Sequence, residues 1–236
     1  MNRRMMALGL AAAIAVPAAA SAAETPVQPR IVVTGEGQAS IAPDLALLSL
    51  SVMRESATAR EALDANNAAM NDVTEAIKGM GVENRDIQTS GLQIFPRYNF
   101  TNKPDGTQEA QLVGYQVTNT LSVRVRDISK TGEILDKAVT LGVNQGGNIT
   151  FTNEDPSATV TEARKRAVED ATEKAKTLAG AAFVKLGRVL EISDQTFGIQ
   201  PMPIEAKAFD RALSAVPIQA GENSYRVQVN MTFELE

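Results

Sequence analysis

The 236-residue chain has no cysteine, no histidine and no tryptophan. The lack of cysteine excludes disulfides, thiol nucleophiles and covalent haem attachment. The lack of histidine excludes Ser-His-Asp triads and imidazole-ligated zinc or copper sites. Side-chain packing alone must therefore stabilise the fold, and several common kinds of catalytic and metal site are ruled out.

Basic residues are also in the minority, with 23 Lys and Arg against 28 Asp and Glu. This balance argues against nucleic acid and anionic membrane surfaces as main partners. The N-terminus has the layout of a secretory signal: Arg3 and Arg4, an apolar stretch over Met5–Val16, and small residues before the expected cleavage after Ala23, or after Ala22. The stretch is too short for a membrane span and no second one follows. We expect a periplasmic mature chain, residues 24–236, forming one domain.

Hydrophobic periodicity predicts alternating strands and helices. The expected strands are Ile31–Ala39, Leu45–Met53, Ile87–Tyr98, Gln111–Arg126, Gly147–Thr152, Leu186–Ser193 and Ser224–Glu236. Helical spacing follows in Leu63, Met70, Val73, Ile77 and Met80, with Asn66 or Asn67 on the same stripe. A short helix is expected from Asp127 to about Thr140, and a long one opens at Asp155-Pro156, with Val160, Ala163, Ala167, Ala171, Leu178 and Ala182 on one face.

The order of these elements repeats. Strand, helix, strand and long strand run over about 44–126 and again over about 147–236, and Tyr115-Gln116-Val117 aligns with Tyr225-Arg226-Val227. The sequence therefore predicts an α+β fold of two β-α-β-β repeats, with helices packed on antiparallel sheet and the short helix joining the repeats.

Motifs that could carry chemistry are weak. Gly35-Glu36-Gly37 lacks the third glycine of a dinucleotide fingerprint and is better explained as a strand bend. The carboxylates of Asp105 with Glu109, and of Glu154 with Asp155, lack calcium-loop spacing, and turn or helix-cap roles explain them. We expect no catalytic residues, no metal site and no cofactor.

One apolar, proline-rich stretch stands out within a 25-residue segment, 196–220, that has no clear secondary structure. Long segments of this kind in compact domains are usually functional or disordered, and the apolar content argues against disorder. We expect it to form an oligomer interface, with packing on its own domain as the alternative. The candidate interface residues are Phe197, Ile199, Pro201, Met202, Pro203 and Ile204.

Several stretches together resemble the SIMPL-domain (YggE-like) family over nearly the whole mature chain. They are Ile31–Gly37, Thr140–Gly147, Glu162–Ala167, Leu186–Val189 and Ala220–Tyr225. The resemblance implies an α+β fold, a periplasmic or outer-envelope location, large ring-like or channel-like homo-oligomers and a link to oxidative-stress tolerance. It implies no agreed catalytic residues. The family usually has glycine near Phe183, which leaves the end of the long helix open.

These observations favour a non-enzymatic protein of the periplasm or envelope that self-assembles, with itself as partner, no nucleic acid and no transmembrane segment. Two alternatives stay open. One is a periplasmic carrier that binds a small ligand or peptide. The other is a hydrolase that uses carboxylate, Ser or Lys chemistry.

Overall fold

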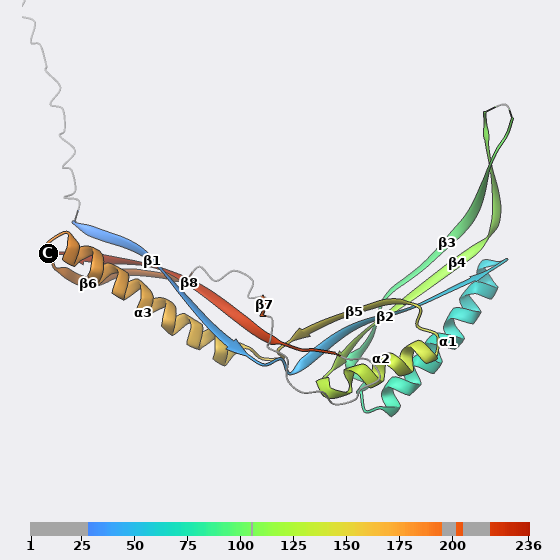
Figure 1. Cartoon of the computed structure of the whole chain (residues 1–236), viewed down its shortest axis with the longest axis horizontal. Coiled ribbons are helices and arrows are strands. Elements are labelled where there is room, and N and C mark those ends of the chain that lie inside the picture. The colour runs from blue at the N-terminus through green and yellow to red at the C-terminus, as the bar shows by residue number, and fades with distance from the viewer. Residues whose placement is uncertain (1–27, 105, 195–201, 205–217) are drawn as a thin grey trace, which may run out of the picture.

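The computed structural model describes residues 28–104, 106–194, 202–204 and 218–236. They form an elongated arc of two lobes (Figure 1). The elements are β1 (Arg30–Ile41), β2 (Leu45–Ser56), α1 (Ala59–Gly79), β3 (Ile87–Asn102), β4 (Gln108–Val125), α2 (Thr131–Thr140), β5 (Gln145–Thr152), α3 (Ser157–Ala181), β6 (Leu186–Asp194), β7 (Met202–Ile204) and β8 (Glu222–Leu235), with 3-10 turns at Asn84–Asp86 and Ile128–Lys130. The α+β class is confirmed.

Each lobe is an antiparallel sheet covered by helix. In the α1 lobe the strand order is β3-β4-β2-β5, and α1 and α2 pack beside it. In the α3 lobe the order is β1-β8-β6, β7 also pairs with β8, and α3 covers the sheet. Thus β1, the first strand in the sequence, pairs with the C-terminal strand β8 and not with β2, while β5 pairs with β2. The division into two sequence repeats remains a prediction.

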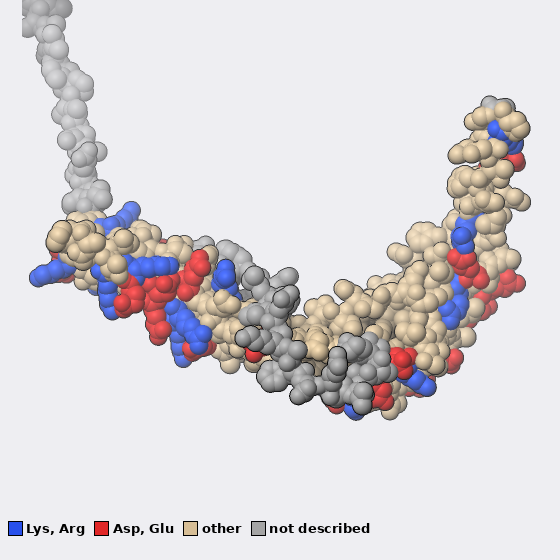
Figure 2. Space-filling view, in the orientation of Figure 1, with Lys and Arg blue, Asp and Glu red and all other residues tan. Residues whose placement is uncertain are grey.

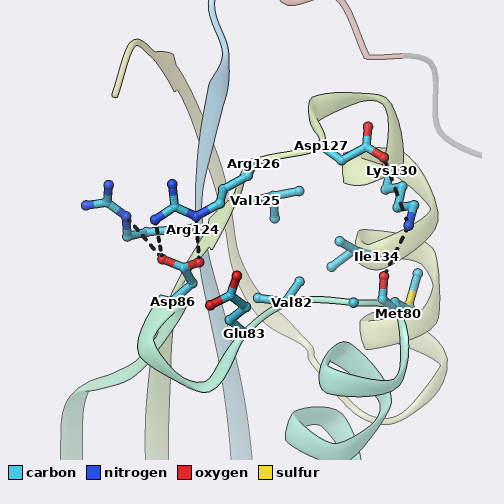
Figure 3. Close-up of a pocket in the computed structure, with 11 residues that line it drawn as sticks. Met80, Val82, Glu83, Asp86, Arg124, Val125, Arg126, Asp127, Lys130 and Ile134 are labelled. Atoms are coloured by element: carbon cyan, nitrogen blue, oxygen red, sulfur yellow. Dashed lines mark hydrogen bonds and ion pairs between the residues drawn. The ribbon is translucent and has the colours of Figure 1, made fainter. Parts of the chain in front are cut away.

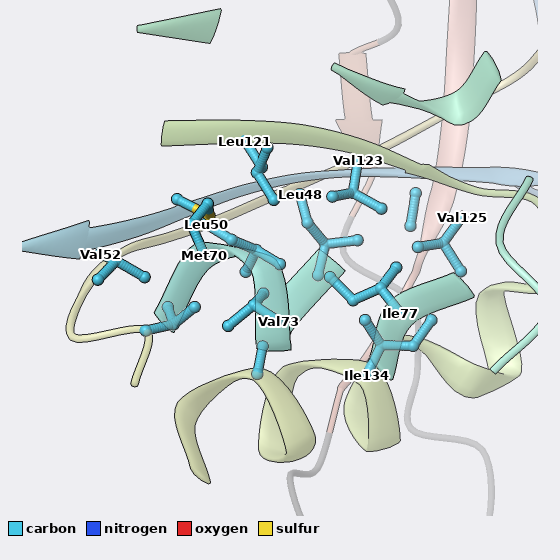
Figure 4. Close-up of a cluster of buried hydrophobic side chains, with 13 residues drawn as sticks. Leu48, Leu50, Val52, Met70, Val73, Ile77, Leu121, Val123, Val125 and Ile134 are labelled. Carbon is cyan, nitrogen blue, oxygen red and sulfur yellow. The ribbon is translucent and has the colours of Figure 1, made fainter. Parts of the chain in front are cut away.

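The α1 lobe has a core of branched aliphatic side chains that meet between sheet and helices (Figure 4). The alternate positions of β2 supply Leu48, Leu50 and Val52, and the stripe of α1 supplies Val73 and Ile77. Their periodicity of two in the strand and 3.6 in the helix is what brings them to one interface. The asparagine on the helical stripe is Asn66, which is fully buried and donates to the main-chain oxygens of Val52 (2.7 Å) and Val117 (3.2 Å).

The α3 lobe is packed differently, because the helix contributes mainly alanine. The buried residues of α3 are Val160, Ala163, Ala167, Ala171, Ala175 and Ala179. The sequence prediction that Leu178 and Ala182 continue this stripe is wrong: both are exposed. From Ala163 to Ala179 the buried residues recur every four positions, so they form an i, i+4 ridge that follows the twist of the sheet. Leu178 lies seven positions after Ala171, and a step of seven leaves this ridge.

The long helix ends in a left-handed cap although the residue there is not glycine. Phe183 has a φ of 60°. Its N–H donates to Gly180 O and the Val184 N–H donates to Ala179 O, both at 3.1 Å. This bonding is that of a Schellman motif, in which glycine is the usual residue. Phe183 therefore adopts the conformation that its side chain disfavours.

The two lobes meet at a small buried polar cluster around Asn153. Its amide nitrogen donates to Ala42 O at 2.8 Å. Its Oδ1 accepts from Asn223 Nδ2 at 3.0 Å and from the Tyr225 hydroxyl at 2.9 Å. The β1–β2 connection, the residue after β5 and the start of β8 are thereby joined. Among the described residues, no helix combines the length and apolarity that crossing a membrane requires.

Candidate functional site

A small cavity of about 130 Å³ lies where β4 meets the end of α1 (Figure 3). Its charged rim centres on Asp86, which is only 4% exposed. Arg126 grips both carboxylate oxygens of Asp86, with Nε donating to Oδ2 at 2.9 Å and Nη2 to Oδ1 at 3.2 Å. Arg126 also donates to the carboxylate of Glu154. Arg124 Nη2 lies 3.7 Å from Glu154 Oε1.

These contacts fix the ionisation of the cluster. The hydrogen bonds from Arg126, which outweigh the effect of burial, hold the pKa of Asp86 below its ordinary value. The same pairing raises the pKa of Arg126. Each cation on the rim faces an acid, including Lys130, whose Nζ lies 4.0 Å from Asp127. The cavity is smaller than the roughly 300 Å³ at which ligand pockets begin, so the cluster is best explained as a structural clamp.

Of the other carboxylates singled out in the sequence, Asp105 lies outside the described residues, whereas Glu109 and Asp155 have structural partners. Glu109 pairs with Lys103 at 3.0 Å across the hairpin. Asp155 accepts from the Ser157 N–H at 3.0 Å at the start of α3. Hydrogen bonds from the side chain and the main chain of Ser157 lower the pKa of Asp155. Within the parts of the chain that the structure describes, no three acidic side chains gather as a metal site would require.

The two glycines of the Gly35-Glu36-Gly37 stretch face α3. A Cβ on Gly35 would lie 2.0 Å from the carbonyl oxygen of Ala167, and one on Gly37 would lie 1.9 Å from that of Ala163. The stretch is therefore the surface on which the helix backbone rests, and this close approach explains why both positions lack a side chain.

A large exposed apolar surface lies on the β3–β4 hairpin, which projects from the arc (Figure 1). Large apolar side chains on it are between 44% and 62% exposed: Leu92, Ile94, Phe95, Tyr98, Phe100, Leu112 and Val113. Lys, Arg, Asp and Glu are dense on the α3 lobe and sparse on this hairpin apart from its tip (Figure 2). A surface of this size and polarity usually marks an interaction site.

Sequence reasoning did not single out this hairpin. It predicted both strands and placed Val113, Tyr115 and Val117 on one face of the second, but it assigned no exposed apolar surface to either. The sequence did contain a signal for it, because the predicted strands of the hairpin are longer than the predicted helix that should cover them. The candidate stretch Phe197–Ile204 falls mostly outside the described residues. Of it, the structure shows only that residues 202–204 form β7 and pair with β8. The expectation that 196–220 has no regular structure is wrong for these three residues.

Comparison with known proteins places the chain in a family. The model of the SIMPL family, described as "Protein of unknown function (DUF541)", matches residues 31–233. The chain is a member of the SIMPL family. The resemblance noted from the sequence stretches, to SIMPL-domain and YggE-like proteins, is thus confirmed.

Two relatives within the SIMPL family show the range of similarity. The 26 kDa periplasmic immunogenic protein of Brucella melitensis is 50% identical over 233 residues, which cover 96% of this chain and 93% of the relative. The uncharacterized protein YggE of Escherichia coli strain K12 is 29% identical over 227 residues, covering 92% of this chain and 88% of the relative. The similarity therefore extends over both lobes of the SIMPL fold.

Proposed function

We propose that the mature chain is a non-enzymatic protein of the periplasm or envelope that self-assembles into a large, ring-like or channel-like homo-oligomer. The observation that carries the proposal is the projecting hairpin, whose apolar side chains are about half exposed. Leaving such a surface in water costs free energy, at roughly 25 cal/mol per Å² of apolar area. A contact with other copies of the chain would remove this cost.

The shape of the molecule supports the same proposal. The described chain is an extended arc with its hairpin at one end and the end of α3 at the other (Figure 1). Curved, elongated subunits with contact surfaces far from their centre form closed rings when each subunit binds the next through the same contact and the rotation between them closes. The proline-rich stretch Phe197–Ile204 remains a proposed second contact.

The periplasmic part of the proposal has two supports. The first 23 residues have the layout of a cleavable secretory signal. A relative that is 50% identical is named as a periplasmic protein. We also propose a contribution to oxidative-stress tolerance, and because the chain has no cysteine, this contribution cannot use thiol chemistry.

Light scattering on the purified mature protein, residues 24–236, tests the assembly. We expect a mass that is a multiple of the subunit mass and that is constant over a tenfold dilution. Replacing Phe197, Ile199 and Met202 by serine should lower this mass while the circular dichroism of the strands and helices is kept. A wild-type mass equal to that of one subunit at all concentrations would refute the proposed function.

A further inference from the structure

The hairpin carries most of its large apolar side chains on one face. Residues directly opposite in an antiparallel pair point to the same side, and neighbours along a strand point to opposite sides. On β3 the even-numbered residues from Leu92 to Phe100 are apolar, and from Ile94 on they lie opposite Val117, Tyr115, Leu112 and Ala110 of β4, while Leu92 lies opposite Asn119. We call this set the ribbon face: Leu92, Ile94, Pro96, Tyr98, Phe100, Ala110 and Leu112.

The ribbon face continues the face of the sheet that the helix covers. Ile94 lies opposite Val117, which is fully buried and whose carbonyl accepts from Asn66 of α1. The rings of Tyr98 and Phe100 contact each other farther out, with centroids 6.5 Å apart. The opposite face of the hairpin is more polar, with Gln93, Arg97, Asn99 and Thr101, but it also carries the large apolar residues Phe95 and Val113.

The covering helix is too short for this face. The 21 residues of α1 span about 31 Å, whereas the 18 residues of β4 span about 61 Å. The last β4 residue that pairs with β2 is Tyr115, opposite Ser56, so Gln108–Gly114 extend beyond both β2 and the helix. About half of the strand therefore has no helix beside it.

The described residues that flank 205–217 lie far from this face. Ile204 pairs with Glu222, next to Asn223, which donates to Phe151 O beside the start of β2. A 13-residue segment held at both ends reaches at most about 23 Å. The hairpin leaves the sheet at Ser56, and the ten residues from Ala46 to Ser56 span about 33 Å. The N-terminal arm expected after cleavage has four residues before residue 28 and starts at the far end of the other lobe.

We propose that the ribbon face packs on the ribbon face of a second copy of this chain, in an antiparallel, two-fold arrangement. This inference rests on the proposed self-assembly and names one contact within it. Identical faces that carry no charge can meet without like-charge repulsion, and none of the seven ribbon-face residues carries a charge. The two-fold arrangement sets the aromatic outer end of one copy, Tyr98 and Phe100, on the aliphatic inner end of the other, Leu92 and Ile94.

The area is too small for an isolated, tight dimer. A ribbon of 11 residues and two strands is about 36 Å long and 10 Å wide, which gives a footprint of roughly 350 Å² per copy. Stable interfaces bury about 800 Å² per partner. The ribbon contact therefore acts together with at least one other contact, and its loss should break a large assembly into smaller ones and not abolish association altogether.

A serine triple variant tests the contact. Tyr98→Ser, Phe100→Ser and Leu112→Ser together remove the exposed end of the ribbon face from both copies. We expect a lower oligomer mass in light scattering and an increase of at least about 100-fold in the dissociation constant of the step that is lost. Phe95→Ser is the matched control, because it removes a half-exposed aromatic ring from the opposite face of the same strand. It should leave the mass unchanged.

Crosslinking provides a second readout that does not depend on stability. The chain has no cysteine, so a single introduced thiol is unique. Pro96→Cys lies in the middle of the ribbon face, close to the proposed two-fold axis, and a bismaleimide about 10 Å long matches the distance between packed sheets. It should give a covalent dimer, whereas Asn99→Cys on the opposite face should not.

The outcomes separate this inference from the proposed function. If wild-type protein is monomeric, both fail. If it assembles, but the serine triple variant keeps the same mass and Pro96→Cys crosslinks no better than Asn99→Cys, the ribbon contact is refuted and self-assembly stands. If the triple variant and the Phe95→Ser control lose mass equally, the hairpin acts without a preferred face, which also refutes the ribbon contact.

Discussion

The two lobes solve the same packing problem in opposite ways. In the α3 lobe the 25-residue helix spans about 37 Å along a β8 of about 46 Å, so it runs over most of the length of β1 and β8, whereas β6 stays largely exposed. In the α1 lobe the strands are longer and the helix is shorter. Small residues let α3 lie almost in contact with the sheet backbone, whereas α1 stands off on a layer of leucine, valine and isoleucine (Figure 4).

The edges of the two sheets differ as well. Along β1, three alternate residues have main-chain groups bonded by side chains of α3: the Glu36 N–H donates to Asp170 (2.8 Å), Lys174 donates to Thr34 O (3.1 Å) and Arg166 donates to Gln38 O (2.7 Å). For β3, no side chain among the described residues bonds a main-chain group in this way. Capped edges resist further pairing and open ones invite it. The comparison therefore supports the proposal that contacts between copies form on the α1 lobe, whose outer edge is open, and not on the capped β1 edge of the α3 lobe.

The largest expected effect comes from filling the close contact in the α3 lobe. In Gly37→Ala, the new Cβ would lie 1.9 Å from Ala163 O and 2.4 Å from Ala167 N, both of them helix backbone. The helix must move away from the sheet, which should cost about 4 kcal/mol of unfolding free energy. Urea denaturation measures the cost, and hydrogen exchange should show that protection is lost in α3 and β8 first.

A glycine of the α1 lobe provides the control. At Gly91 on β3, a Cβ would have nothing within 4 Å of it. Gly91→Ala should be neutral or stabilise by about 0.5 kcal/mol, because alanine loses less backbone freedom on folding. Equal destabilisation by the two variants would show that close packing does not distinguish the lobes.

A smaller effect is expected at the clamp of the α1 lobe. Asp86→Asn removes the negative charge that accepts two hydrogen bonds from Arg126. It should lower the free energy of unfolding by about 2 kcal/mol at pH 7. Because the folded state lowers the pKa of Asp86, its contribution is complete above the ordinary value of 3.8 and is lost as the pH falls through the lowered value. The stabilities of wild type and variant should therefore converge below about pH 4.

Chemical denaturation at a series of pH values measures this difference. Arg124→Gln is a suitable comparison, because Arg124 Nε lies farther from the Asp86 carboxylate, at 3.6 Å, and its side chain is 43% exposed. It should cost less than Asp86→Asn. A constant difference between wild type and Asp86→Asn from pH 7 to pH 3 would contradict the clamp.

Local elements could be predicted from the sequence because their causes are local. In the last strand, apolar and polar residues alternate, and Tyr225, Val227 and Val229 on the apolar side are buried. The helical stripe of α1 located Ile77, and of the two asparagines considered for that stripe, Asn66 is buried and hydrogen-bonded. In each case the residue pattern itself fixes which side faces the core.

Features that depend on distant parts of the chain could not be predicted in this way. Nothing local states that β1 pairs with β8 or that β5 pairs with β2. The exposure of Leu178 depends on how the twisted sheet meets α3. The exposure of Tyr98 and Phe100 depends on where α1 begins relative to the hairpin, and an alternating apolar strand gives the same pattern whether or not a helix covers it.

The smallest effect concerns the outer end of the α3 lobe, where Phe183 is 97% exposed and has a φ of 60°. A non-glycine residue in this conformation costs roughly 1 kcal/mol, and an exposed ring recovers none of that cost by packing. Phe183→Gly should therefore stabilise the monomeric unit by about 1 kcal/mol, whereas Phe183→Ala should change little, because alanine keeps the same backbone conflict. Thermal unfolding of the three proteins decides between them. If glycine stabilises and the assembly keeps its mass, the α3 lobe contributes stability alone. If glycine stabilises the subunit but lowers the mass in light scattering, this exposed ring is a contact, and the division of roles between the two lobes has to be redrawn.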